Sequence, residues 1–449
     1  MRTRPGARDL SERTLALVMA GGNGTRLGDL TRWHSKPALP FGGQYRNIDF
    51  PLSNCVNSGI RHIALLTQYK AHSLIQHVQQ GWSFLRPEVG EFIEIWPAQQ
   101  RRGTGWYAGT ADAVYQNIDL IEAFAPACVL VLAGDHVYRM DYRAMVESHI
   151  GSGAGITVGA IEVPISTASA FGVMSVDPSG RVSRFDEKPS RPQSLREDPG
   201  TALASMGIYA FDPELLVDCL SRDAANPASV HDFGRDILPD AVGRIGVSAY
   251  VFRDPSTGRA AYWRDVGTVD SYWQANMELL AEPPALDLYD QSWPLWTRQP
   301  HCPPPRFIGE GVARQSIVSG GCSVAGRVEQ SVLSTDCRVQ QGASVESSVL
   351  LPNVVVGRNC RIRRAIIDSG CVIPDGLVIG ENGVDDAARY HISPNRVALV
   401  TADMLRRQAA SHLYARPPET EIDLLLERLE ESLVLPNGAS LRAETRSPA

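Results

Sequence analysis

The residues most suited to chemistry in this sequence lie in a glycine-rich stretch near its start. An apolar run, Leu15 to Met19, is followed by glycines and then by polar and basic residues, namely Gly21, Gly22, Gly24, Thr25, Arg26 and, further along, Lys36. Because glycine has no side chain, backbone N–H groups in such a turn can approach a polyphosphate closely, and Arg26 adds a planar, permanently charged group that suits phosphate oxygens. An ordinary strand-to-loop turn is the alternative for the glycines alone. The spacing differs from the Walker and dinucleotide-binding patterns, and it predicts a phosphate-binding loop of another kind.

Two aspartates are candidates for binding a divalent cation. Asp135 follows the apolar run Val129 to Ala133, so a strand would deliver its carboxylate at the edge of a sheet. Asp265 ends the sequence Tyr262-Trp-Arg-Asp. Mg²⁺ prefers oxygen ligands and keeps several waters, so two carboxylates and a triphosphate would suffice to bind it. Taken alone, Asp135 could equally cap a turn, and Asp265 is better explained by capping or a salt bridge.

Two further segments could contact a substrate. Lys188 precedes Pro189, which favours an extended backbone at Lys188, and from a strand end its ammonium could reach a phosphate. A solvated surface lysine is the common alternative, and Glu187 could accept hydrogen bonds from sugar hydroxyls. Gly109 and Thr110 open a predicted helix, whose N-terminus favours a polar or anionic ligand.

Four ring side chains lie beside these motifs. Trp106 and Tyr107 could pack against a base or a sugar, with core packing as an equal alternative. His136 and His231 are interpreted as hydrogen-bonding pocket residues, because an ionised phosphate acting as a nucleophile needs no general base.

Composition narrows the class of protein. At 449 residues, with 43% apolar and 21% charged residues, the chain can form two or three domains with a large core. A net charge of −7 argues against a nucleic-acid binder, and no apolar run of membrane-spanning length occurs. The eight cysteines form no C-x-x-C pair, and the polar residues 1–13 are expected to be a disordered tail without a secretory signal. We therefore expect a cytoplasmic protein with no membrane or nucleic-acid partner.

Residues 14–282 alternate between strand-like apolar runs, such as Ile60 to Leu66 and Cys128 to Ala133, and helix-like stretches. This alternation predicts an α/β domain with a mostly parallel sheet, whose ligands lie beyond the carboxyl ends of the strands. Residues 283–311 are rich in proline and are interpreted as an ordered connector, because their tryptophans would suit a free linker poorly.

Aliphatic residues recur every six positions over residues 312–381, with small or polar residues between them. Two neighbouring registers satisfy the period near its end, Ile366, Val372, Val378 and Ile367, Ile373, Ile379. A hexapeptide period is typical of a parallel β-helix, and a β-sandwich is the alternative. Because an open solenoid exposes its ends and flank, we expect subunits to assemble. The C-terminal segment, 382–449, includes a predicted amphipathic helix at about 419–435.

Together these motifs resemble those of the sugar-1-phosphate nucleotidylyltransferases, in particular the bacterial members that make ADP-glucose. The most specific parts are Phe41-Gly-Gly-Gln-Tyr-Arg-Asn-Ile-Asp-Phe50, Pro97-Ala-Gln-Gln100, Ala133-Gly-Asp-His136 and Tyr262-Trp-Arg-Asp-Val-Gly-Thr268. The resemblance implies a Rossmann-like nucleotidyltransferase domain with a mixed sheet, followed by a left-handed parallel β-helix, in a homotetramer. It also implies that ATP and α-D-glucose 1-phosphate react, with Mg²⁺, to ADP-glucose and pyrophosphate for glycogen synthesis under allosteric control.

The resemblance further implies roles for individual residues. Catalysis would involve Arg26, Lys36, Asp135 and Lys188, and the metal ligands would be Asp135 and Asp265. The ATP side would comprise Gly21, Gly22, Gly24, Thr25, Gln68, Gly109 and Thr110. The glucose 1-phosphate side would comprise Tyr107, Gly172, Glu187, Lys188, Ser205, Tyr209, Asp232 and Trp263. Sugar phosphates and adenine nucleotides would act as effectors through Arg46, Gln99 and Trp106.

Four positions depart from the pattern of the enteric members. Trp33 and His34 stand in place of a Lys-Arg pair, Pro40 in place of a histidine and Ala108 in place of an arginine. We therefore expect allosteric control by a different effector class or with a different strength.

Three other functions stay open at this stage: a relative that uses another base or sugar, a non-catalytic regulatory subunit, and a hexapeptide acyltransferase. The presence of Asp135 and Lys188 argues against the regulatory subunit. The lack of a histidine between residues 312 and 379 argues against the acyltransferase.

Overall fold

The computed structural model describes residues 7–22, 24–99, 106–255 and 257–414. The chain divides into two compact units, Met1–Thr401 and Ala402–Ala449, and the described part of the second unit is helix α11 (Ala402–Tyr414). The amphipathic helix predicted at about 419–435 lies outside the described residues. Within the described part, no helix is both long and apolar enough to cross a membrane.

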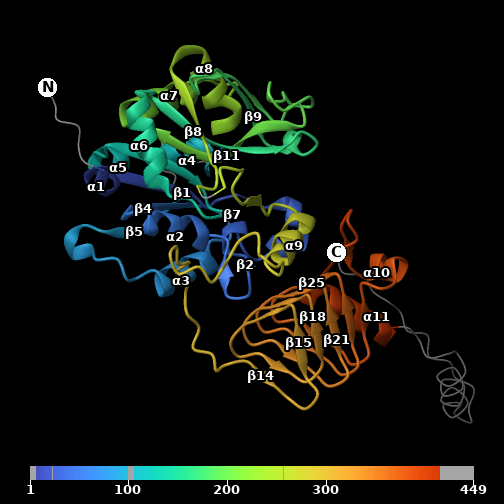
Figure 1. Cartoon of the computed structure of the whole chain (residues 1–449). Helices are drawn as coiled ribbons and strands as arrows, with labels where there is room; N and C mark the ends of the chain where they lie inside the picture. The colour runs from blue at the N-terminus through green and yellow to red at the C-terminus, as the bar shows by residue number, and fades with distance from the viewer. Residues whose placement is uncertain (1–6, 23, 100–105, 256, 415–449) are drawn as a thin grey trace, which may run out of the picture. The chain divides into compact units, whose positions relative to one another are not determined.

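A mixed nine-stranded sheet forms the centre of the N-terminal α/β part of the first unit (Figure 1). Its parallel part runs in the order β6 (Cys128–Ala133), β1 (Thr14–Met19), β4 (His62–Thr67) and β5 (Phe92–Pro97). The long strand β11 (Thr201–Phe211) pairs antiparallel with β6, β8 (Ile156–Pro164) and β9 (Gly172–Val176). Strand β10 (Val182–Glu187) pairs with β9, and β12 (Val247–Val251) pairs with β8. The predicted α/β fold with a mixed sheet is confirmed.

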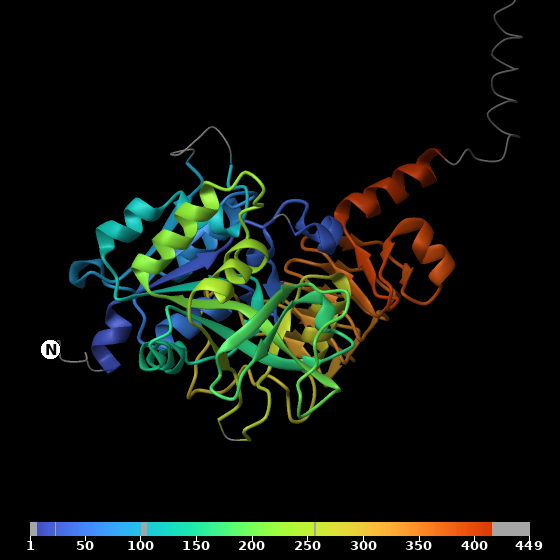
Figure 2. The ribbon, with the colours of Figure 1, turned by 90° about the horizontal axis from the view of Figure 1, so that it is seen from above.

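Helices cover both faces of this sheet, because successive side chains of a strand point to opposite sides (Figure 2). On one face, Ala16 and Val18 of β1 pack in a core with α2 (Asp49–Asn57), α3 (His72–Gly81) and α6 (Tyr142–Ser152). On the other, Leu15 and Leu17 pack with α4 (Thr110–Tyr115), α5 (Ile118–Phe124), α7 (Pro213–Ala224) and α8 (Leu238–Arg244). These four consecutive residues of β1 are all buried, which explains the continuous apolar run in the sequence.

The start of the described chain is helical. Residues Ala7–Glu12 form α1, Leu10 is buried, and the Thr14 hydroxyl donates a hydrogen bond to the Leu10 carbonyl at 2.7 Å. The expectation of a disordered tail is therefore wrong for residues 7–12. The polar composition concealed the helix, because this short segment shows no apolar periodicity in the sequence.

Three parallel sheets form the predicted left-handed β-helix, which is confirmed. The first contains β14 (Arg306–Phe307), β17 (Ser323–Val324), β20 (Arg338–Val339), β23 (Val355–Val356) and β26 (Val372–Ile373). The second contains β15 (Val312–Arg314), β18 (Arg327–Glu329), β21 (Ser344–Glu346), β24 (Arg361–Arg363) and β27 (Val378–Ile379). The third contains, in parallel, β16 (Ile317–Val318), β19 (Val332–Leu333), β22 (Val349–Leu350), β25 (Ala365–Ile367) and β29 (Ala398–Val400). Strand β28 (His391–Ile392) pairs antiparallel with β29 at the edge of this sheet.

The structure chooses between the two hexapeptide registers. Ile373 is 1% exposed and points into the β-helix, whereas its neighbour Val372 is 64% exposed. The inward register is therefore Ile367, Ile373, Ile379, and the other register points outward. Ile366 belongs to the outward register, yet it is buried because the α/β part (residues 7–282) covers the third sheet.

Contacts between the α/β part and the β-helix extend beyond apolar packing. Trp273, on α9 (Val269–Glu278), donates from Nε1 to the Ser347 carbonyl at 2.8 Å, and the Arg364 guanidinium lies 4.4 Å from the centre of its ring. The β-helix also extends past its expected end at residue 381. Helix α10 (Gly383–Arg389) and β28 interrupt the sequence period, and β29 then pairs in parallel with β25.

The proline-rich connector packs along helix α2. Trp293 Nε1 donates to Asn54 Oδ1 at 3.0 Å, and Thr297 Oγ1 donates to Asp49 Oδ2 at 2.7 Å. The tryptophans of this segment thus make specific contacts, which a free linker would lack.

Candidate active site

A cleft of 610 Å³ opens beyond the carboxyl ends of β1, β4 and β6, where Met19, Leu66 and Ala133 form part of its wall. This is the expected place for a ligand in an open α/β sheet, and the size suits a small-molecule site. All residues predicted to act in catalysis, metal binding or substrate binding line it: Gly21, Gly22, Gly24, Thr25, Arg26, Lys36, Gln68, Tyr107, Gly109, Thr110, Asp135, Gly172, Glu187, Lys188, Ser205, Tyr209, Asp232, Trp263 and Asp265.

The glycine-rich loop turns sharply at the end of β1. Gly24 has a φ of 59°, a left-handed conformation that favours glycine, and its carbonyl accepts a hydrogen bond from Thr31 Oγ1 at 2.9 Å. The short helix Thr25–Thr31 begins at this turn and carries Arg26. The Arg26 side chain is 58% exposed, and its Nη2 lies 3.6 Å from Asp265 Oδ2. The Arg26 guanidinium thus lies next to the glycine-rich loop and is accessible to a ligand.

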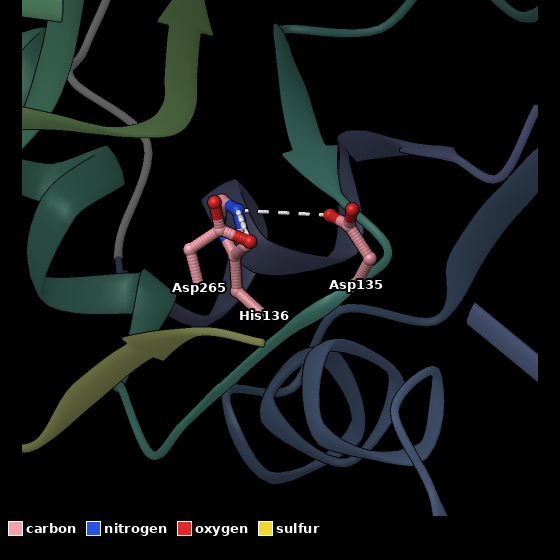
Figure 3. A group of neighbouring side chains, drawn as sticks. All are labelled: Asp135, His136 and Asp265. Carbon is pink, nitrogen blue, oxygen red and sulfur yellow. Dashed lines mark ion pairs between the residues drawn. The ribbon is translucent and has the colours of Figure 1, made fainter. Parts of the chain in front are cut away.

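Two short strands bring the candidate metal ligands together. β7 (His136–Tyr138) pairs antiparallel with β13 (Trp263–Asp265), which places His136 opposite Asp265. Asp135, immediately before β7, therefore lies beside Asp265 although the two are far apart in the sequence. One ligand atom from each of Asp135, His136 and Asp265 lies within 4.8 Å of the others (Figure 3).

Lys36 lies between the two carboxylates. Its Nζ is 2.7 Å from Asp135 Oδ2 and 2.6 Å from Asp265 Oδ1, and its side chain is 6% exposed. Burial alone would lower the pKa of Lys36, but the two carboxylates outweigh burial and raise it above its usual value. Burial alone would raise the pKa of Asp265, but Lys36, followed by His136 and Arg26, lowers it to about 2. Lysine and aspartates are therefore all charged near neutral pH.

These residues fit a divalent metal ion. The two aspartates already accept a cation between them, the Lys36 ammonium, and carboxylate oxygens are the ligands that hard divalent ions prefer. A bound ion would compete with the Lys36 ammonium for the two carboxylates. The ammonium would then be available to interact with the phosphates of a substrate.

Glu187 and Lys188 form another part of the cleft wall. Lys188 Nζ lies 2.9 Å from Glu187 Oε1, and 60% of the Lys188 side chain is exposed. The backbone of Lys188 has a φ of 46°, so the extended conformation predicted from Pro189 is wrong. A hydrogen bond from Lys188 N to the Phe171 carbonyl at 3.1 Å holds the left-handed turn, and this tertiary contact outweighs the local preference.

Glycines give this wall its shape. A Cβ added at Gly172 would lie 2.8 Å from Glu187 Oε2, and one added at Gly234 would lie 2.5 Å from the same atom. Larger residues at either position would displace the Glu187 carboxylate.

Thr110 and Asp232 join two other parts of the wall. Thr110 Oγ1 donates to Asp232 Oδ2 at 3.0 Å and accepts from Phe233 N at 3.0 Å. Asp232 Oδ1 in turn accepts from Gly234 N at 3.0 Å. Near the start of α4, Gln68 Nε2 donates to the Tyr107 carbonyl at 3.4 Å. Side chains from distant segments are thus locked together around the cleft.

Aromatic rings complete the pocket. The Trp263 ring lies 5.0 Å from the His136 ring and 5.2 Å from the Phe171 ring, and its buried Nε1 has no hydrogen-bond partner among the described residues. Burial raises the pKa of Tyr209 well above its usual value, so Tyr209 is a neutral hydroxyl. Both residues could donate a hydrogen bond to a bound hydroxyl-rich ligand.

Gly267 is a site residue that the sequence interpretation missed. A Cβ at this position would lie 2.8 Å from Asp265 Oδ1, 2.9 Å from Arg26 Nη2 and 3.1 Å from Lys36 Nζ. The sequence signal was its place in the motif Trp263-Arg-Asp-Val-Gly-Thr268, but a glycine there could equally have been a turn residue.

The three predicted allosteric residues are not among the described residues that line the cleft, although Trp106 packs against one of the lining residues, Tyr69. Arg46, in β3 (Tyr45–Arg46), which pairs with β2 (Pro40–Phe41), donates from Nη1 to the Ala38 carbonyl at 3.1 Å and the Ser73 carbonyl at 3.3 Å. Gln99 is exposed, and the Trp106 ring packs 5.8 Å from the Tyr69 ring. Their roles stay predictions.

The α/β fold, the glycine loop and the carboxylate pair define the chain as a nucleotidyltransferase. A family model described as "Nucleotidyl transferase" matches residues 15–282, and one described as "GlmU-like, C-terminal hexapeptide" matches residues 303–400. Three relatives named glucose-1-phosphate adenylyltransferase are each 54% identical to the chain, and they come from Paramagnetospirillum magneticum, Methylococcus capsulatus and Thiobacillus denitrificans. The matches cover 89%, 90% and 91% of this chain and 95%, 96% and 93% of the respective relatives. The chain therefore belongs to the glucose-1-phosphate adenylyltransferase family.

Proposed function

We propose that this chain transfers the adenylyl group of ATP to α-D-glucose 1-phosphate, giving ADP-glucose and pyrophosphate for glycogen synthesis. The observation that carries the proposal is one cleft lined by a glycine-rich phosphate loop, two adjacent carboxylates and the cationic side chain of Lys188. The names of the relatives support the choice of both substrates.

In the proposed reaction, a phosphate oxygen of glucose 1-phosphate attacks the α-phosphorus of ATP. A new P–O bond forms as the bond to pyrophosphate breaks, and pyrophosphate leaves with the electron pair. The nucleophile is already ionised, so the chain supplies orientation and charge stabilisation. Arg26 and Lys36 would stabilise the triphosphate, and Lys188 would hold the sugar phosphate.

The sugar would be recognised by the hydrogen-bonding side chains of the same wall. Glu187 could accept hydrogen bonds from its hydroxyls, and Trp263 Nε1 could donate to one, because that buried donor lacks a partner among the described residues. Gln68, Gly109 and Thr110 would contact the adenosine part.

Mg²⁺ is the divalent ion that we propose for this site. Asp135 and Asp265 would hold it, and when bound it would neutralise phosphate charge. The chain's own contribution is the placement of the two carboxylates, which β7 and β13 hold side by side.

The test is pyrophosphate release from ATP and glucose 1-phosphate by the wild type and by Asp135→Asn. We expect the variant to lose at least about 100-fold in turnover, because the charge that organises the site is removed while its shape is kept. Asp177→Asn is a matched control, since Asp177 is an exposed carboxylate in the β9–β10 turn.

Wild-type activity in Asp135→Asn would remove Asp135 from its role. Faster turnover of the wild type with GTP, UTP or CTP than with ATP would instead identify a relative that uses another base.

We also propose a homotetramer located in the cytoplasm. The first coil of the β-helix leaves Phe307 and Ile308 exposed, as expected of a solenoid end that another subunit covers. All eight cysteines are free thiols, which suits a reducing compartment. Light scattering after size-exclusion chromatography measures the assembly, and a monomeric mass would contradict the tetramer.

Sugar phosphates and adenine nucleotides are proposed as effectors that act through Arg46, Gln99 and Trp106. Trp33, which is exposed, carries no charge for a phosphate, so we expect weak activation by fructose 1,6-bisphosphate. Initial rates across a panel of glycolytic intermediates and adenine nucleotides test this, and strong activation would show that Trp33 does not matter.

A further inference from the structure

A turn held by Asp223 and His231 lies just before Asp232. The Asp223 carboxylate, near the end of α7, accepts a hydrogen bond from His231 Nδ1 at 2.7 Å through Oδ2 and one from Ser229 Oγ at 2.6 Å through Oδ1. The Ser229 hydroxyl in turn accepts from His231 N at 2.9 Å. Because an ionised carboxylate can only accept, these bonds set the ring tautomer of His231 and the path of the turn.

The backbone of His231 adopts a left-handed conformation. Its φ is 59°, a region that residues other than glycine seldom occupy, although histidine, asparagine and aspartate are enriched there. Such a conformation persists only where neighbouring contacts determine it. Here the contacts are the bonds of the His231 ring and amide to Asp223 and Ser229.

This turn determines the position of the His231 carbonyl. That oxygen accepts a hydrogen bond from Ala111 N at 2.8 Å, in the first turn of α4. A Cβ added at Gly109 would lie only 2.2 Å from the same oxygen, so the two segments are in direct contact. The start of α4 is therefore docked on the His231 backbone.

The next residue faces the cleft. Asp232 lines it, accepts from Thr110 Oγ1 at 3.0 Å and caps the segment Phe233–Ile237 through Gly234 N and Arg235 N. Among the described residues that form the cleft wall, Asp232 and Phe233 are present and His231 is not. His231 thus lies outside the cleft wall, and its connection to the wall runs through its backbone carbonyl and through the next residue, Asp232.

We propose that Asp223 and His231 are positioning residues that hold the ATP side and the glucose 1-phosphate side of the cleft in one fixed relation. The ATP side is the start of α4 at Gly109 and Thr110, and the sugar side is Asp232. This inference rests on the proposed function, and it names two residues outside the cleft wall that control both substrate subsites.

Binding of both substrates is the property that should respond. The two subsites lie at the ends of the substrates and away from the reacting phosphorus, so the contacts are the same before and during reaction. Loss of such uniform binding raises KM and leaves kcat unchanged. A merely structural role would lower the thermal midpoint and the active fraction, and it would leave both KM values unchanged.

Four variants separate the contributions. Asp223→Ala removes the acceptor, and His231→Ala removes the donor while keeping a side chain in the left-handed region. His231→Gly accepts the backbone conformation without the hydrogen bond. His231→Asn keeps both properties, because asparagine tolerates this region and its amide can donate to Asp223.

We expect Asp223→Ala and His231→Ala to raise KM for ATP and for glucose 1-phosphate by about tenfold each, with kcat near the wild-type value. His231→Gly should be intermediate, and His231→Asn should restore both KM values. Asp240→Ala is the matched control, because it removes an exposed carboxylate paired with Arg244 on the neighbouring helix α8. ATP binding at equilibrium gives a second readout that does not depend on turnover.

Unchanged KM values and ATP affinity in folded Asp223→Ala and His231→Ala would overturn the inference, as would an equal defect in His231→Asn. If the wild type itself makes no ADP-glucose, the proposed function fails, and the ATP-binding comparison still tests the role of the turn. Circular dichroism establishes which variants are folded.

Discussion

At the scale of single residues, the candidate site depends on a cluster of charged side chains that are largely buried from solvent. Lys36 neutralises two aspartates that would otherwise repel each other, and each side of this cluster keeps the other ionised. The space for the cluster comes from a residue without a side chain, Gly267, which lies against Asp265, Arg26 and Lys36.

Gly267→Ala tests how closely the cluster must fit. The added methyl would meet the Asp265 carboxylate first and then the ends of the Arg26 and Lys36 side chains, and all three are side-chain groups that can shift without disturbing the backbone. We therefore expect kcat/KM to fall about tenfold or more while the thermal midpoint changes little. Gly151→Ala on α6 is the matched control, because an added Cβ there meets nothing within 4 Å. Equal activity of the two variants would contradict the role of Gly267.

At the scale of elements, short strands and buried polar pairs set the positions of the larger pieces. The two-stranded ribbon of β7 and β13 is only three residues long, yet it brings the two aspartates together. Helix α6 is joined to β8 by a buried hydrogen bond between His149 Nδ1 and Thr157 Oγ1 at 2.9 Å. In the β-helix, one residue of register separates a core position from a surface position.

His149 should make stability depend on pH. Burial, partly opposed by Asp212, lowers the pKa of His149 from 6.5 to about 4. Below pH 6.5 this histidine is therefore protonated in the unfolded chain but stays neutral in the folded chain. The free energy of unfolding consequently decreases as the pH falls from 6.5 towards 4. The loss attributable to this group is about 3 kcal/mol. The thermal midpoint of His149→Gln should fall less over this range than that of the wild type. His72→Gln, at an exposed histidine, should behave as the wild type does.

The β-helix register predicts opposite results for two adjacent residues. Ile373→Ala should destabilise this part by about 2–5 kcal/mol, because it leaves a cavity among the stacked coils. Val372→Ala should change stability by less than about 0.5 kcal/mol, since Val372 is exposed. Thermal unfolding compares the two, and a larger effect at Val372 would mean that the inward register is assigned wrongly.

At the scale of the whole first unit, an apolar core joins the catalytic part to the β-helix. Val332, Val349 and Ile366 of the third sheet share this core with Leu27 and Phe41 of the catalytic part. Leu27 lies one residue after Arg26, so the sheet supports the segment that carries a candidate catalytic charge.

Trp273→Ala should weaken this junction. It removes the hydrogen bond to the Ser347 carbonyl and the ring beneath Arg364. We expect a thermal midpoint several degrees lower and faster proteolysis between the two parts, in line with a loss of about 3 kcal/mol. Trp33→Ala, at an exposed tryptophan, is the control and should leave both measurements unchanged.

The sequence by itself determined the class of each part and the identity of most residues in the cleft. Periodicity suffices for this, because a period of six specifies a β-helix and alternating elements specify an α/β sheet. Residue types and spacing pointed to the glycine-rich loop, Arg26 and the two aspartates as phosphate and metal candidates, whereas the remaining cleft residues were assigned through the resemblance to a known family. The sequence could not reveal helix α1 or strand β29, because α1 is short and mostly polar and β29 follows an interruption of the period.

Only the tertiary structure decided how distant residues meet. The pairing of β7 with β13, the left-handed turn at Lys188 and the contact of His231 with the start of α4 all depend on hydrogen bonds between segments remote in sequence. Local preferences are weak beside such contacts, as the wrong expectation for Lys188 illustrates. Residue types and motifs thus indicated which side chains could bind phosphate and metal. The positions that bring these side chains into one cleft were set by contacts between distant segments of the fold.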